Sequence, residues 1–247
     1  MTFFPLGDNN PRVLVQRPWV TWSIVGACTL FFIWEKLINP DGFDARVLDF
    51  AIVPALVSGN FEPAAAMPLP PWATLVTSLF LHVDTLHLAV NMLYLWVFGD
   101  NIEDAMGHAK FVVFYLVCGV IAGLVHVWLD PYSMAPTLGA SSAVSAVLGG
   151  YLLLHPRAKV WFFPSPFALP AWFWLVAWIG FQIYAAYQTG WTGNGVAWGA
   201  HIGGFLAGLL LVIPMRRKTV PLLGPAETPS GVRFAGKPPA SLDEGED

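Results

Sequence analysis

Four polar residues lie in apolar stretches of the sequence and carry side chains that could act together in catalysis: Ser141, His201, His87 and Asn91. A serine hydroxyl is a weak nucleophile, and a histidine that is neutral near pH 7 can take its proton and later protonate a leaving amine. His87 and Asn91 are four residues apart and share a helix face, so both could stabilise the oxyanion of a tetrahedral intermediate. No Asp or Glu in these stretches is placed to complete a triad, so the sequence predicts a Ser-His dyad.

The composition predicts an integral membrane protein. Of the 247 residues, 56% are hydrophobic and 11% are charged, whereas a soluble chain has about 25% charged residues. The 12 Trp and 18 Phe suit the aromatic belts at membrane interfaces. The net charge of −4 and the lack of a basic patch give no indication of nucleic-acid binding. Cys28 and Cys118 lie within apolar runs, which favours small buried residues over a structural disulfide.

Six apolar segments predict an all-α membrane protein, a six-transmembrane-helix bundle. They are residues 19–38, 85–98, 111–129, 140–154, 167–187 and 196–215. Arg12 and Arg17 precede the first segment, which favours a signal anchor over a cleavable signal peptide. The first loop, 39–71, is long enough to carry amphipathic or interfacial structure of its own. Residues 99–108 are expected to form a short polar loop.

The basic residues predict the orientation. An even number of spans places both termini on one side, and the positive-inside rule makes that side cytoplasmic. The basic residues on that side are Arg12, Arg17, Arg157, Lys159, Arg216, Arg217 and Lys218. We expect a cytoplasmic N-terminal segment (1–18), a six-span membrane domain (19–215) and a disordered cytoplasmic tail (216–247). The expected location is the inner membrane of a bacterial cell.

The fourth segment is too short to cross a bilayer. Pro136 and Pro156 bound it and leave about 15 helical residues, roughly 22 Å long against a hydrocarbon core of about 30 Å. If its cytoplasmic end meets the interface, Ser141 lies about 8 Å below the outer surface. The second and sixth segments run in the same direction and place Asn91 about 9 Å deep and His201 about 8 Å deep. Three segments thus bring polar groups to one level.

Small residues can bring the fourth and sixth segments together. They recur every four residues at Ser141, Ser145 and Gly149 in the fourth segment, and at Gly199, Gly203, Gly204 and Gly208 in the sixth. Such faces let helix backbones approach closely in a membrane. Ser141 and His201 could then reach hydrogen-bond distance.

These motifs resemble those of the rhomboid family of intramembrane serine proteases. Gly139-Ala-Ser141 is similar to the Gly-x-Ser nucleophile motif of the family, and Ala200-His201-Ile-Gly-Gly, with Gly208, resembles its base motif. His82, His87 and Asn91 follow its His, His and Asn pattern, and the match covers about 72–214. The resemblance implies that Ser141 is the nucleophile and His201 the base, assisted at the oxyanion by His87 and Asn91. It also implies six spans and a long membrane-associated first loop.

Three positions differ from the family pattern. Ser142 stands where the family usually has Gly, Ala73 where many members have Arg after Trp, and Ser145 where some have an aromatic residue. These differences leave open a catalytically impaired rhomboid-like protein that binds membrane clients. A small-molecule transporter is a second alternative, although the sequence has no visible inverted repeat. A metal site at His82, His87 and His201 is disfavoured because no carboxylate accompanies them.

The favoured interpretation is an intramembrane serine endopeptidase that cleaves single-span or polytopic membrane proteins within the lipid bilayer, with no metal or organic cofactor. The cut is expected near the outer end of a substrate helix. A helical substrate hides its peptide bonds in intrahelical hydrogen bonds, so it must unwind before attack. Small or helix-breaking residues near the cut should therefore be favoured.

Overall fold

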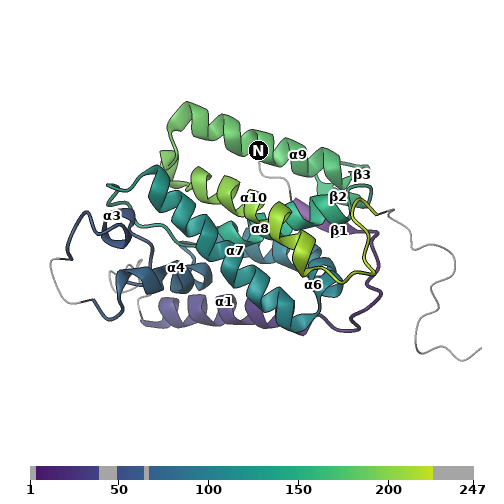
Figure 1. Cartoon of the computed structure of the whole chain (residues 1–247), viewed down its shortest axis with the longest axis horizontal. Coiled ribbons are helices and arrows are strands. Elements are labelled where there is room, and N and C mark those ends of the chain that lie inside the picture. Colours follow the sequence, from purple (N-terminus) through teal and green to yellow (C-terminus); the bar gives the residue numbers. More distant parts are fainter. Residues whose placement is uncertain (1–3, 39–48, 64–66, 225–247) are drawn as a thin grey trace, which may run out of the picture.

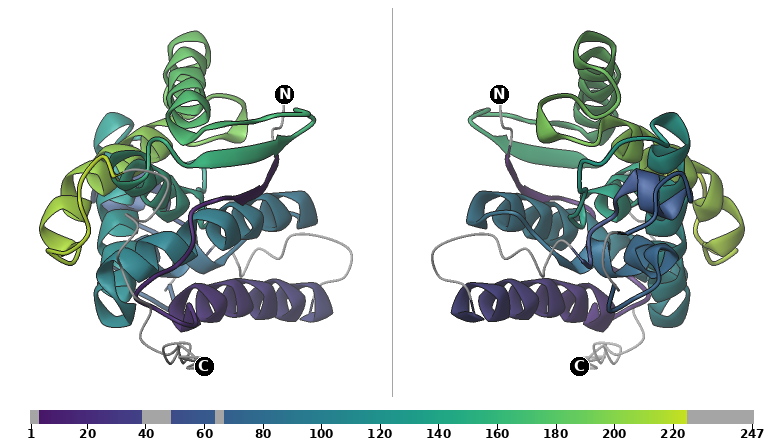
Figure 2. Two further views of the ribbon diagram at one scale, coloured as in Figure 1. Left: turned by 90° about the vertical axis from the view of Figure 1, so that its right-hand side faces the viewer. Right: turned by 90° about the vertical axis from the view of Figure 1, so that its left-hand side faces the viewer.

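Apolar helices make up most of the chain in the computed structural model, which describes residues 4–38, 49–63 and 67–224. Helices α1 (Trp19–Ile38) and α9 (Ala171–Thr189) lie on opposite sides of the bundle (Figures 1 and 2). Helices α7 (His108–Leu129), α8 (Ser141–Leu154) and α10 (Trp198–Met215) lie between them.

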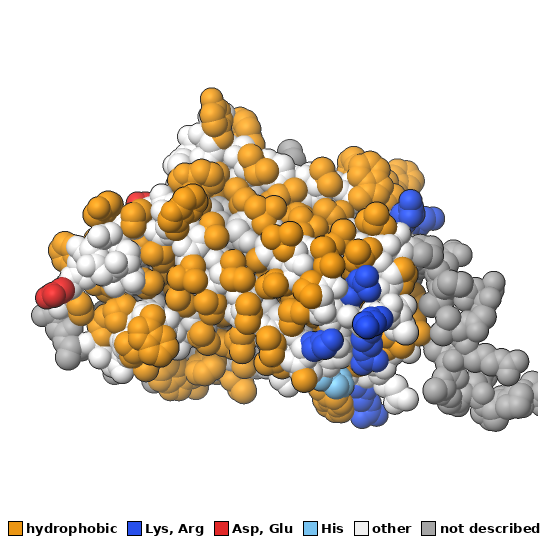
Figure 3. Space-filling view, viewed as in Figure 1, with side chains coloured by type: hydrophobic (Ala, Val, Ile, Leu, Met, Phe, Trp, Pro, Cys, Tyr) orange, Lys and Arg blue, Asp and Glu red, His pale blue; other side chains and the backbone are white. Residues whose placement is uncertain are grey.

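The outer helices turn large apolar side chains outward. Trp34 of α1, Trp128 of α7 and Phe181 of α9 are each at least half exposed. Figure 3 shows hydrophobic side chains over the middle of one face, whereas the Lys and Arg side chains gather at one end. An apolar band with charges confined to its ends is the pattern of a membrane-spanning bundle.

Helix α8 lies in the centre of the bundle. The structure begins it at Ser141, one residue after the predicted start, and ends it at Leu154 as predicted. Nearly all of its side chains are buried, among them Ser145 and Tyr151. A helix without a polar face must be covered on all sides, here by α7, α10 and the neighbouring helices.

Glycines bring α8 and α10 into backbone contact, as the spacing of small residues predicts. A Cβ atom added to Gly204 would lie 2.1 Å from the carbonyl oxygen of Ser142, and one added to Gly208 would lie 2.0 Å from that of Ala146. From the other side, a Cβ on Gly149 would lie 2.2 Å from the carbonyl oxygen of Phe205. No residue but glycine fits at these three positions without moving the helices apart.

The second predicted span, 85–98, begins at Thr85 as expected, but a bent helical segment precedes it and the helix continues beyond the predicted end. Three short helices, η1 (Pro71–Ala73), α4 (Thr74–Thr77) and η2 (Ser78–Phe80), precede α5 (Thr85–Tyr94). The two parts meet at an angle of 80°. Asp84 caps α5, because its Oδ1 accepts a hydrogen bond from the His87 N–H group at 2.8 Å.

The prediction of a polar loop at 99–108 is wrong, because most of these residues are helical. The helix continues from α5 through a π-helical turn, η3 (Leu95–Gly99), into α6 (Asp100–Met106). It ends at Gly107, whose φ of +85° favours glycine. The acidic residues of α6 do not face solvent, because they bind the N-terminal segment of the chain.

The prediction of an all-α fold is wrong in one respect, because the structure also contains a small three-stranded sheet. Strands β1 (Phe4–Asp8), β2 (Lys159–Phe163) and β3 (Ala168–Pro170) pair antiparallel in the order β1-β2-β3. Along β2, Val160 and Phe162 are buried, whereas Lys159, Trp161 and Phe163 are exposed. This alternation is the signal of a half-buried strand. Strands β1 and β2 lie outside the predicted spans, whereas β3 occupies the first residues of the predicted fifth span, 167–187, whose helix therefore begins later, at Ala171.

Length and hydropathy identify fewer spans than the six predicted. Among the described residues, three helices are long and apolar enough to cross a membrane: Trp19–Leu37, His108–Leu129 and Trp198–Met215. The bent pair Pro71–Phe80 and Thr85–Met106 would make a fourth if it forms one broken span. Helix α8 is apolar but shorter than the others. The count of six remains a prediction.

The expected first loop and tail are described in part. Helix α3 (Pro54–Val57) is a short helix within the first loop, whereas 39–48 and 64–66 lie outside the described residues. After α10 the chain packs against the bundle, since the N–H group of Arg217 donates to Ala105 and that of Leu223 to Leu153. The tail expected to be disordered spans 216–247; its residues 216–224 instead pack in this way, and residues 225–247 lie outside the described part of the chain.

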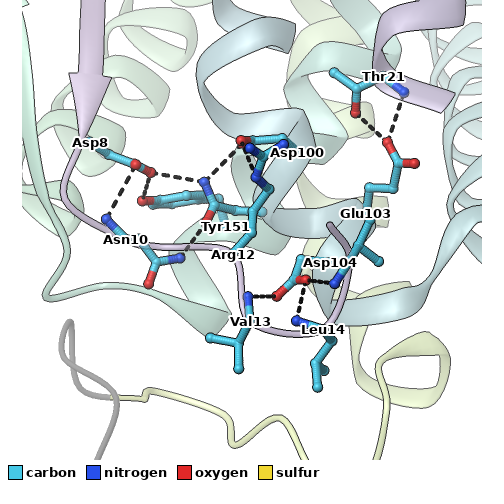
Figure 4. Close-up of polar contacts among 12 residues, drawn as sticks. Asp8, Asn10, Arg12, Val13, Leu14, Thr21, Asp100, Glu103, Asp104 and Tyr151 are labelled. Atoms are coloured by element: carbon cyan, nitrogen blue, oxygen red, sulfur yellow. Dashed lines mark hydrogen bonds and ion pairs between the residues drawn. The ribbon is translucent and has the colours of Figure 1, made fainter. Parts of the chain in front are cut away.

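Carboxylates of α6 hold the N-terminal segment to the bundle (Figure 4). Asp104 accepts hydrogen bonds from the backbone N–H groups of residues 13–15, with distances of 3.0 Å to Val13 and 2.7 Å to Leu14. Fully buried Glu103 accepts from the first turn of α1, at 3.0 Å from the N–H group of Val20 and 2.8 Å from that of Thr21. A carboxylate at a helix N-terminus is stabilised by unpaired N–H groups and by the helix dipole.

Asp8 links the segment to α8. Its Oδ2 accepts hydrogen bonds from the Tyr151 hydroxyl and from Asn101 Nδ2, the latter at 3.0 Å. Burial raises the pKa of Asp8 from 3.8 to about 6, and it outweighs the hydrogen bonds from the Tyr151 hydroxyl and the Asn10 N–H group, which lower this pKa. The folded state therefore binds this proton more tightly than the unfolded state does.

The stability of the protein should consequently fall as the pH rises from about 4 to about 6, by at most about 1.4 kcal/mol per pH unit from this group. Asp8→Asn should remove that part of the pH dependence. Thermal unfolding of both proteins in detergent across this pH range measures the difference. Parallel curves for the two proteins would contradict the assignment to Asp8.

Candidate active site

Ser141 is the first residue of α8, and the loop that precedes it is held from two sides. The N–H group of Gly139 donates to the Ser78 carbonyl at 2.9 Å, and that of Ala140 contacts Nε2 of buried His82 at 3.5 Å. Gly139 has a φ of +132°, a conformation that L side chains rarely adopt. The loop thereby turns Ser141 toward α10.

His201 of α10 meets Ser141. Its Nε2 atom lies 2.9 Å from the Ser141 hydroxyl oxygen, within hydrogen-bond distance. The close approach of α8 and α10 at Gly204, one turn after His201, makes this contact possible. The structure thus brings together the two residues that the sequence predicts as nucleophile and base.

Two tryptophans flank the imidazole. The rings of Trp178 on α9 and Trp198 on α10 lie 6.2 Å from it, centroid to centroid. Ser145, where some family members carry an aromatic residue, instead donates its hydroxyl to the Ser141 carbonyl at 2.6 Å. The His201 ring is therefore held between side chains of α9 and α10.

The far side of the imidazole contacts a residue that the sequence analysis missed. Nδ1 of His201 lies 2.8 Å from Oε1 of Gln182 on α9. The orienting groups expected from the sequence were Asp and Glu, whereas Gln182 carries a neutral amide. The signal was present, because Gln182 is a polar side chain within an otherwise apolar stretch of the fifth predicted span.

His87 lies beside the serine, and Asn91 supports it. A Cβ atom on Gly139 would lie 2.6 Å from Cε1 of His87 and 3.6 Å from the Ser141 hydroxyl oxygen, so the His87 ring packs on the loop that carries Ser141. Asn91 is buried, and its Nδ2 donates to the His87 carbonyl at 2.9 Å. This bond uses one of the two N–H groups of the amide.

A small cavity adjoins Ser141. It has a volume of about 20 Å³, and its lining includes Ser78, His126, Thr137 and Ala200. The Ser78 hydroxyl and Nδ1 of His126 are buried without a hydrogen-bond partner among the described residues. A cavity of this volume is large enough for one water molecule, and these two groups could bind it.

The site offers little to a metal ion. Among the described residues, no group of three or more His, Cys, Asp or Glu side chains is arranged to hold one. His201 is directed to Ser141 and Gln182 instead. The arrangement is suited to acid–base and nucleophilic chemistry by side chains alone.

Comparisons with known proteins agree on one family. The family model described as the Rhomboid domain matches residues 70–218, which include all four predicted site residues. The chain is 32% identical over 146 residues to mitochondrial rhomboid protein 1 of Saccharomyces cerevisiae, covering 56% of this chain and 40% of that protein. It is 28% identical over 197 residues to rhomboid protease GlpG of Salmonella choleraesuis, covering 78% of this chain and 61% of that protein. The matches thus span less than two thirds of the length of either relative.

Proposed function

Since this chain belongs to the rhomboid family, we propose that it is an intramembrane serine endopeptidase in which Ser141 is the nucleophile and His201 is the general base. Its family and its apolar helices make it an integral, multi-pass membrane protein. The observation that carries the proposal is the distance of 2.9 Å between the Ser141 hydroxyl oxygen and Nε2 of His201.

The chemistry follows from that contact. Nε2 of His201 takes the proton as the Ser141 oxygen attacks the carbonyl carbon of the substrate, and a tetrahedral intermediate forms. The imidazolium then gives the proton to the leaving amine, which leaves an ester on Ser141. Water, activated by the same imidazole, hydrolyses the ester, and the cavity beside Ser141 suits a water molecule near this point.

The oxyanion needs hydrogen-bond donors. The first-turn N–H groups of α8 have no intrahelical acceptors, and they lie next to the attacking oxygen. His87 packs on the same loop, and the second amide hydrogen of Asn91 has no acceptor among the described residues. We assign these two side chains to oxyanion stabilisation and to holding the substrate.

We place the site in the outer half of the bilayer, with both termini in the cytoplasm. The basic side chains at one end of the molecule support this orientation (Figure 3). The proposed arrangement is a cytoplasmic segment (1–18), a six-span domain (19–215) and a cytoplasmic tail (216–247), in the inner membrane of a bacterium. Substrates are membrane proteins whose helices unwind at small or helix-breaking residues near the outer surface.

Cleavage by the purified protein in liposomes tests the proposal. The substrate would be a single-span protein with glycine and alanine near the outer end of its helix, and mass spectrometry would locate the cut. We expect one cut within or beside the apolar segment, made by the wild-type protein and not by Ser141→Ala. Substrate that is bound but never cut would favour the catalytically impaired, client-binding alternative.

A further inference from the structure

Gln182 is an unusual residue on α9. The helix exposes many of its side chains, among them Phe181 and Ile183 on either side of Gln182. Gln182 itself is only 5% exposed and points inward, to His201. A polar side chain inside a membrane is costly, and its partner identifies what it does there.

The contact selects one tautomer of His201. Oε1 of Gln182 can only accept a hydrogen bond, so the Nδ1 atom 2.8 Å away must carry the hydrogen. A neutral imidazole with its hydrogen on Nδ1 has its lone pair on Nε2, which faces the Ser141 hydroxyl. The other tautomer would present an N–H group to the serine and could not accept its proton.

We propose that Gln182 is the positioning residue of the site: its side-chain oxygen fixes the tautomer and the ring orientation of His201. The inference rests on the proposed function and adds a third member, from a third helix, to the predicted Ser-His pair. Gln182 does not touch the reacting atoms and acts only through the imidazole.

A neutral amide suits this place better than a carboxylate. A carboxylate buried among apolar side chains is costly unless it is paired. The other titratable groups that act electrostatically on His201 are His87 on α5 and His126 on α7, and neither supplies a negative charge. Gln182 therefore orients the base without a buried charge, and it still accepts a hydrogen bond from the imidazolium during the reaction.

The contact also makes the base depend on α9. His201 and Ser141 lie on α10 and α8, which glycines hold together. Gln182 and Trp178, one turn apart on α9, both contact the outer side of the imidazole. Displacement of α9 would leave the distance between Ser141 and His201 unchanged. It would remove the acceptor that keeps the hydrogen on Nδ1, so His201 could adopt either tautomer.

Two substitutions at Gln182 separate positioning from packing. Gln182→Leu has a similar size and no acceptor, whereas Gln182→Glu keeps an acceptor in the same place. Tyr184→Phe, two residues away on the exposed side of α9, is the matched control. The readout is the rate of covalent labelling of Ser141 by a fluorophosphonate from pH 5 to pH 9, measured on the full-length protein in detergent.

We expect Gln182→Leu to slow labelling by about 10- to 100-fold, as loss of an orienting partner does elsewhere. Gln182→Glu should stay within about tenfold of the wild-type protein at its optimum. Its acidic limb should move to higher pH, because the carboxylate stabilises the imidazolium. Tyr184→Phe should label like the wild-type protein.

Two results would overturn the inference. One is a labelling rate for Gln182→Leu within threefold of the wild-type rate. The other is an equal loss in both variants with the wild-type pH profile, which would indicate a packing role only. Failure of the proposed function is distinguishable, because the wild-type protein itself would then show no labelling that depends on His201.

Discussion

Replacement of Ser141 or His201 by alanine should lower the rate of substrate cleavage by at least about 10³-fold. Serine without a base is a poor nucleophile, and a base without the serine has no covalent route to offer. The two side chains are 2.9 Å apart and act as one unit, so the double variant should be no slower than the slower single variant. Single-turnover cleavage in liposomes measures all three.

Ser23→Ala is a matched control for this prediction, because Ser23 lies exposed on α1. It should cleave at the wild-type rate. Independent, multiplicative losses in the double variant would argue that Ser141 and His201 contribute separately, against a shared proton transfer.

The second large effect is expected from a single methyl group between α8 and α10. In Gly204→Ala the new Cβ would lie 2.1 Å from the Ser142 carbonyl oxygen, so one helix must move. Overpacking of this kind costs about 1–3 kcal/mol. A displacement of about 1 Å between nucleophile and base costs about 10²-fold in rate. We therefore expect a lower unfolding temperature and at least about 10²-fold slower cleavage.

Gly26→Ala provides the comparison. A Cβ at Gly26 of α1 meets nothing within 4 Å, and alanine favours the helix over glycine. This variant should be as stable and as active as the wild-type protein. Wild-type stability and cleavage in Gly204→Ala would contradict the view that backbone contact between α8 and α10 sets the geometry of the site.

The contact between Ser141 and His201 could be predicted because local signals agreed. Two prolines bounded the short segment, and repeated small residues marked the faces of both helices. The helix bounds of α1 and α8 follow from the same apolar patterns, to within one residue. The structure of a segment can be predicted from the sequence where the residues of that segment alone determine it.

The other features depend on residues far away in the chain. Taken alone, the acidic residues of α6 predict a solvent-exposed loop. In the structure two of them, Glu103 and Asp104, are buried. They can be buried because backbone N–H groups such as those of Val13 and Thr21 donate hydrogen bonds to them. Strand β1 pairs with a strand about 150 residues later, which no local pattern indicates. Gln182 carries no charge, and its partner is on another helix. In each case a distant partner decides the structure.

Covalent labelling of Ser141 tests the central claim most directly. The protein in detergent would be treated with a fluorophosphonate, and the labelled residue would be identified by mass spectrometry, beside His201→Ala. The account predicts that the wild-type protein is labelled at Ser141 and that the variant, which keeps this serine, is labelled at least about 10²-fold more slowly. Labelling at a different residue, or equal rates in both proteins, would contradict it.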